Sequence, residues 1–110
     1  MVSKKYSVKN LNGNLHEFRK RLGDDKTGFF EKIEDIPYVS RDRALEIYRA
    51  GTTTLAVDYE FGENNKTKVS AEIVADTPVG ISYTRKRLTD LLEGIELEEI
   101  KWKQQQKDWF

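Results

Sequence analysis

The sequence predicts a small α+β domain in which an antiparallel sheet is centred on one β-hairpin and covered by two or three helices. Alternating apolar and polar residues indicate the two hairpin strands at 52–61 and 67–75. Apolar residues at helical spacing predict helices at 15–22, 41–50 and 85–93. A two-stranded hairpin is only marginally stable by itself, so its apolar face needs these helices as a cover.

The hairpin is expected to have one fixed register. A shift by one residue would turn all of its apolar side chains into water. A loop at 62–66 contains glycine and asparagine, which tolerate the positive φ that a reversal requires. The expected pairs are Tyr59 with Val69, Val57 with Ala71, Leu55 with Ile73 and Glu60 with Lys68.

The chain begins with an expected short strand at 5–9. For residues 10–22 two interpretations stay open: a hairpin, which Asn12-Gly13 favours, or a loop followed by the helix 15–22. We favour the helix, because Asn14 begins a capping-box pattern.

A second strand and a second helix are expected before the central hairpin. Residues 29–36 predict a strand that ends at Pro37, since proline offers no N–H to a neighbouring strand. Ser40 is a favourable N-cap for the helix 41–50, and Gly51 stands where helices often end in a left-handed residue.

After the hairpin we expect a brief strand at 81–83 and then the helix 85–93, capped by Thr84. The first turn of this helix would contain three consecutive basic residues, Arg85, Lys86 and Arg87. Positive charges at a helix N-terminus oppose the macrodipole. A local rule broken without an evident gain indicates a place to look for function.

The C-terminal stretch 96–109 fits either a strand or a helix, and we favour an edge strand at 97–103. We therefore expect one domain at 1–103 and an aromatic-ended tail at 104–110. The tail is charged and rich in glutamine, yet it ends on Trp109 and Phe110.

The composition excludes several classes of protein. The chain has 110 residues with 19 basic and 19 acidic side chains, so its formal net charge is zero. It has no cysteine, which removes disulfides and thiol nucleophiles. We see no signal peptide and no apolar run of membrane-spanning length, and we expect a cytoplasmic protein that binds no membrane.

Enzymatic activity is not expected, because no nucleophile, base and stabilising group converge in the sequence. His16 is the single histidine, and we expect it on the surface of its helix. We also expect no metal site and no cofactor.

Two surfaces remain as candidate binding sites. We favour a non-enzymatic protein-interaction module, an accessory factor or inhibitor, that binds a protein partner or itself through a sheet edge or the aromatic side chains Trp102, Trp109 and Phe110. These aromatic residues could instead dock on the domain's own core. The alternative function is nucleic-acid binding. Its candidate residues form two basic clusters with a neighbouring tyrosine: Arg19, Lys20, Arg21, Tyr83, Arg85, Lys86 and Arg87.

Overall fold

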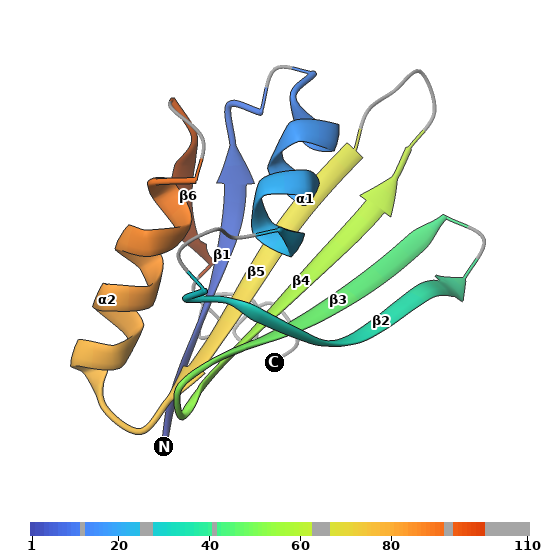
Figure 1. Cartoon of the computed structure of the whole chain (residues 1–110). Helices are drawn as coiled ribbons and strands as arrows, with labels where there is room; N and C mark the ends of the chain where they lie inside the picture. Colours follow the sequence, from blue (N-terminus) through green and yellow to red (C-terminus); the bar gives the residue numbers. More distant parts are fainter. Residues whose placement is uncertain (12, 25–27, 41, 63–66, 92–93, 101–110) are drawn as a thin grey trace, which may run out of the picture.

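In the part of the chain that the structure describes, six antiparallel strands form one sheet, and two short helices accompany it (Figure 1). The computed structural model describes residues 1–11, 13–24, 28–40, 42–62, 67–91 and 94–100, with the backbone alone at 35–40. The elements in chain order are β1 (Val2–Lys9), α1 (Leu15–Gly23), β2 (Glu31–Ser40), β3 (Arg43–Ala50), β4 (Thr53–Phe61), β5 (Thr67–Ala75), α2 (Pro78–Thr89) and β6 (Glu96–Ile100). The order of the strands across the sheet is β2-β3-β4-β5-β1-β6.

The central hairpin is confirmed as β4 and β5. Every pair expected from the alternation is observed: Tyr59 with Val69, Val57 with Ala71, Leu55 with Ile73 and Glu60 with Lys68. The apolar members of these pairs are buried, whereas Glu60 and Lys68 are exposed. Hydrophobic patterning alone therefore specified the register of these two strands.

The expected architecture, a sheet covered by two or three helices, is wrong. Residues 41–50 do not form a helix, because 43–50 are strand β3, which pairs with β2 on one side and β4 on the other. The described residues contain only two short helices, and a six-stranded sheet dominates the structure. The helix at 15–22 is observed as α1, so the hairpin interpretation of 10–22 is wrong as well.

Gly51 explains the error at 41–50. Instead of ending a helix, Gly51 has a φ of +64° and lies with Thr52 in a two-residue turn between the paired residues Ala50 and Thr53. A glycine at the first position of a two-residue hairpin loop is typical of a type II′ turn. The same glycine thus fits both a helix end and a hairpin, and only the pairing of β3 with β4 distinguishes them.

Replacing Gly51 with alanine is expected to lower the free energy of unfolding by about 1–2 kcal/mol, because a Cβ disfavours positive φ. Urea denaturation measures this change. Gly23→Ala is the matched control: its φ is not positive, and the added Cβ would meet its nearest atom, the Tyr48 hydroxyl oxygen, at 4.0 Å. An equal loss of stability in both variants would contradict the role of the turn.

The second helix begins earlier than expected. Thr77, not Thr84, is its N-cap, with the Thr77 hydroxyl accepting a hydrogen bond from the Gly80 N–H at 3.3 Å and Pro78 in the first turn. Residues 81–83 are therefore helical rather than a strand. Lys86 and Arg87 lie in the last turn, where positive charge favours the macrodipole, so the expected conflict does not exist.

The edge strand β2 differs from expectation, whereas the edge strand expected near the C-terminus is observed as β6. The strand β2 continues past Pro37 to Ser40, and its pairing with β3 is interrupted between Lys32 and Glu34 and again between Ile36 and Ser40. An edge strand tolerates proline because its outer side has no partner to bond. The strand β6 is regular, and residues 101–103 of the expected strand 97–103 lie outside the described residues.

The core lies between the sheet and the helices, and Figure 1 shows α1 and α2 on the same face. Phe18 and Leu22 of α1 and Ile81 and Leu88 of α2 are buried in one cluster with the inward residues of the strands. No helix among the described residues lies on the opposite face of the sheet, which we call the open face. Among the described residues the sheet therefore has one face packed against the helices and one open face.

Candidate functional site

The open face contains a hollow near its middle. Ser7 of β1 and Ser70 of β5 lie directly opposite each other, and Asp58 of β4 pairs with Ser70 in the same row. Longer side chains surround the two serines, so the surface is lowest at Ser7 and Ser70. This open-face hollow has a volume of about 1060 Å³. Most of its wall consists of outward side chains from β1, β3, β4, β5 and β6.

An ion pair closes one side of the hollow. The Arg43 guanidinium of β3 donates a hydrogen bond to the Asp58 carboxylate of β4. This hydrogen bond and the charge of Asp58 raise the pKa of Arg43 above its usual value. Both side chains line the hollow, so the negative charge of Asp58 is already neutralised there.

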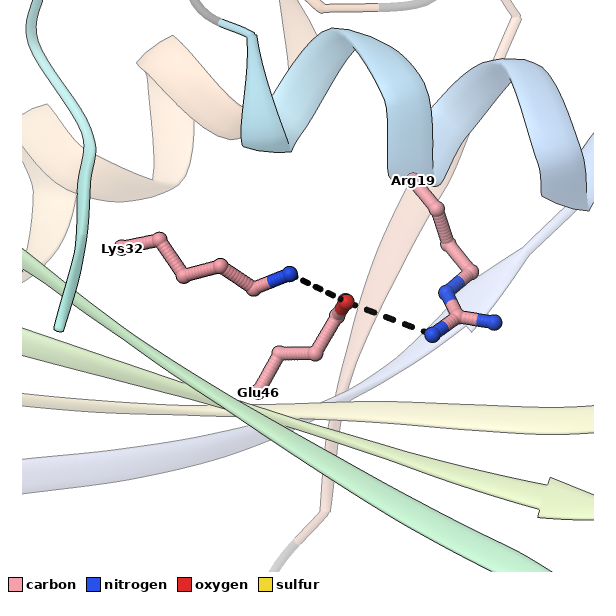
Figure 2. A network of polar contacts seen from close by, with 3 residues as sticks. All are labelled: Arg19, Lys32 and Glu46. Atoms are coloured by element: carbon pink, nitrogen blue, oxygen red, sulfur yellow. Dashed lines mark hydrogen bonds and ion pairs between the residues drawn. The ribbon is translucent and has the colours of Figure 1, made fainter. Parts of the chain in front are cut away.

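A buried carboxylate lies on the other face of the sheet, beneath α1. Glu46 of β3 is only 3% exposed. Figure 2 shows two cations converging on its Oε2 atom: Arg19 Nη2 of α1 at 3.3 Å and Lys32 Nζ of β2 at 3.0 Å. The Arg19 guanidinium also lies 4.6 Å from the centre of the Tyr59 ring. We call these three charged residues the Glu46 cluster.

The Glu46 cluster keeps its carboxylate ionised. Burial by itself would raise the pKa of Glu46, but the Tyr59 hydroxyl, Lys32 and Arg19 outweigh it and hold that pKa below the usual value. Burial and the charge of Glu46 raise the pKa of Tyr59. The Tyr59 hydroxyl is close enough to influence Glu46, yet no hydrogen bond of good geometry joins them within the described residues, so we regard that contact as weak.

The Glu46 cluster joins three elements of the fold. Its ion pairs attach α1 and β2 to β3, and the carboxylate has almost no accessible surface for a substrate. Sequence analysis did not single out Glu46, because this residue lay in the expected helix 41–50. Its partners are separated from it by 27 and 14 residues, so no local pattern indicated the contact.

The arginines of the two basic clusters contact groups of the protein itself. Arg21 pairs with Glu17 at 2.7 Å and donates to the Leu91 carbonyl oxygen. Arg85 donates to the Leu97 carbonyl oxygen and lies over the Tyr6 ring, and Arg87 lies over the Phe29 ring. Arg19 belongs to the Glu46 cluster. The structure therefore directs Arg19 toward β3 and β4 and Arg85 toward β1 and β6.

The other candidates of these clusters are more accessible. Lys20 and Lys86 are exposed, and neither ammonium group has an ion-pair or hydrogen-bond partner among the described residues. Tyr83 is 55% exposed on α2. Its ring packs edge-on against the Phe29 ring, with 5.5 Å between the ring centres. His16 is exposed on α1, as expected.

The tail candidates Trp102, Trp109 and Phe110 lie outside the described residues, and their role stays a prediction. The sheet edges, in contrast, are described.

Among all the residues that the structure describes, no group of three acidic or histidine side chains is placed to hold a metal ion. No described helix is long and apolar enough to cross a membrane.

The edges of the sheet are the remaining candidate surface. The edge strand β2 is irregular and contains proline, whereas β6 pairs with β1 through all five of its residues without a break. Glu96 and Glu98 of β6 are exposed, and Glu99 pairs with Lys4 at 3.5 Å.

No family model, curated protein or solved structure matches this chain.

Proposed function

We propose that this protein is a non-enzymatic interaction module that binds an extended, basic segment of a protein partner at the edge strand β6. The added segment would pair with the outer side of β6 and extend the sheet by one strand. This proposal specifies one of the surfaces expected from the sequence, the sheet edge.

The observation that carries the proposal is the difference between the two edges. Exposed edges are commonly blocked by bulges and proline, and β2 has both features. The strand β6 has neither and is regular, although one of its carbonyl oxygens, that of Leu97, already accepts a hydrogen bond from Arg85. Main-chain hydrogen bonds to the outer backbone N–H and C=O groups of β6 would supply affinity, and neighbouring side chains would supply selectivity.

The charge of β6 indicates the chemistry of the partner. Three of its five residues are glutamates, and the inward side chain Leu97 is buried. Lys4 offsets Glu99, but Glu96 and Glu98 have no ion-pair partner among the described residues. A segment with lysine or arginine at alternate positions would place its charges beside these two carboxylates.

The nucleic-acid alternative has less support. All four arginines in its two clusters already contact protein groups. A phosphate backbone would have to compete for those guanidinium groups, and Lys20 and Lys86 are the lysines that remain accessible in the clusters.

A synthetic peptide of alternating lysine and valine is expected to bind the wild-type protein and to shift the backbone amide resonances of residues 96–100 in an NMR titration. The double variant Glu96→Lys/Glu98→Lys should bind about tenfold more weakly, because attraction becomes repulsion at two exposed sites. The effect should shrink as salt is added.

The matched control is the charge reversal Glu31→Lys/Glu34→Lys on the other edge strand, where both glutamates are also exposed. This variant should bind the peptide like the wild type. A peptide of alternating glutamate and valine should bind far more weakly. Shifts confined to β2, or equal affinities for both peptides, would contradict the proposal.

A further inference from the structure

The floor of the open-face hollow is polar, and its hydroxyl groups make no side-chain hydrogen bond among the described residues. Ser7 and Ser70 face each other across β1 and β5, and both side chains are half-buried. Two hydroxyl groups at the floor of a hollow of about 1060 Å³ are available to a ligand as donors or acceptors.

Three lysines surround this floor. Lys5 and Lys9 lie two residues to either side of Ser7 on β1, and Lys68 lies two residues before Ser70 on β5, so all three share the open face. Val8 pairs with Val69, and Lys9 and Lys68 are the next residues on the two strands beyond that pair. On their other sides Lys9 lies opposite Glu96 and Lys68 opposite Glu60, and these glutamates offset part of the repulsion between the two like charges.

These lysines have no ion-pair partner within 4.0 Å among the described residues. The fourth cation of the hollow, Arg43, is held by Asp58. The hollow thus presents three ammonium groups around two hydroxyls, and an ammonium is a point charge suited to phosphate oxygens.

The remaining lining residues narrow the class of ligand. None of the described lining residues is aromatic, so the hollow offers no ring on which a nucleobase would stack. Glu98 lies directly opposite Ser7 on β6 and Glu60 directly opposite Lys68 on β4, and their carboxylates can accept hydrogen bonds from hydroxyl groups. The volume of the hollow also exceeds what a phosphate group alone would fill.

From this arrangement we propose that the open-face hollow binds a small phosphate ester that carries several hydroxyl groups. The phosphate lies over Ser7 and Ser70 between Lys5, Lys9 and Lys68, and the hydroxyl groups of the ligand contact Glu98 and Glu60. This site shares Glu98 with the peptide-binding edge proposed above, but its lysines and serines lie on β1 and β5, so neither proposal depends on the other.

An NMR titration with glucose 6-phosphate at about 150 mM salt, where exposed charges are screened within about 8 Å, tests the site. We expect saturable shifts at the amides of Ser7 and Ser70, with weaker binding of inorganic phosphate and of glucose. The variant Lys9→Gln/Lys68→Gln should bind glucose 6-phosphate roughly tenfold more weakly for each lysine removed.

The control variant Lys20→Gln/Lys86→Gln removes two exposed lysines from the helices, and it should bind like the wild type. Ser70→Asp, which places a carboxylate on the floor, should abolish binding while the spectrum stays that of a folded protein. Absence of saturable shifts in the wild type, or an equal loss in the control variant, would overturn the site. Equal affinities for inorganic phosphate and glucose 6-phosphate would overturn the role of the hydroxyl groups.

Discussion

Replacing Phe18 with alanine is expected to lower the free energy of unfolding by about 3–5 kcal/mol, the cost of removing a large aromatic side chain from a packed core. Phe18 is completely buried between α1 and the sheet. With Leu22 it supplies the buried surface of a helix that has only nine residues. Short helices depend on such packing rather than on their own propensity, so α1 should also lose its amide protection. Urea denaturation and hydrogen exchange measure the two effects.

The control for Phe18→Ala is Lys20→Ala on the same helix. Lys20 is exposed, so this variant should change stability by no more than about 0.5 kcal/mol. If Phe18→Ala cost no more than this control, α1 would not be anchored by its buried face, and the position of the helix on the sheet would be wrong.

Removing the buried carboxylate is the second large effect. Glu46→Ala is expected to lower the free energy of unfolding by about 3 kcal/mol at pH 7, because it leaves two converging cations without their shared anion. This is the low end of the range for a broken buried pair. Arg19 and Lys32 keep about a third of their side-chain surface exposed, at 35% and 32%, so water partly replaces the lost partner.

The cost of Glu46→Ala should depend on pH. The pKa of Glu46 is lower in the folded protein than in the unfolded chain, where it is about 4.3. Its contribution is therefore complete above that value, and it is lost as the pH falls through the folded pKa. Urea denaturation at pH 7 and at pH 3 should show a smaller difference between wild type and variant at the lower pH.

The exposed carboxylate Glu98 provides the comparison for Glu46. Glu98→Ala should change stability by about 0.5 kcal/mol or less at either pH. A cost for Glu46→Ala that is the same at pH 3 and pH 7 would show that the lost contact is packing rather than charge.

The sequence predicted the central hairpin well because its apolar residues occupy only one face. In β3 the apolar residues do not occupy only one face. Leu45 and Ile47 lie half-buried on the open face, while the charged Glu46 lies on the packed face. Apolar residues on both faces imitate a helical stripe, and a buried glutamate removes the alternation that marks a strand. Gly51 then completed the false helix pattern.

The site could be predicted only in outline. The sheet edge was expected as a binding surface, but the difference between β2 and β6 depends on pairing that no local pattern shows. The open-face hollow depends on Ser7 lying beside Ser70, two residues that are far apart in the chain. The arginine clusters were visible as a sequence pattern, whereas their contacts within the protein appear only after folding.

The position of β1 has a consequence for how the chain acquires its structure during synthesis. The meander β2–β5 can assemble from neighbouring segments, but β1 is made first and pairs only with β5 and β6, which are made much later. Such long-range pairing slows folding, because a large loop must close before the contacts form. We therefore expect β1 to pair late, and its charged residues Lys4, Lys5 and Lys9 to lower its tendency to aggregate until then.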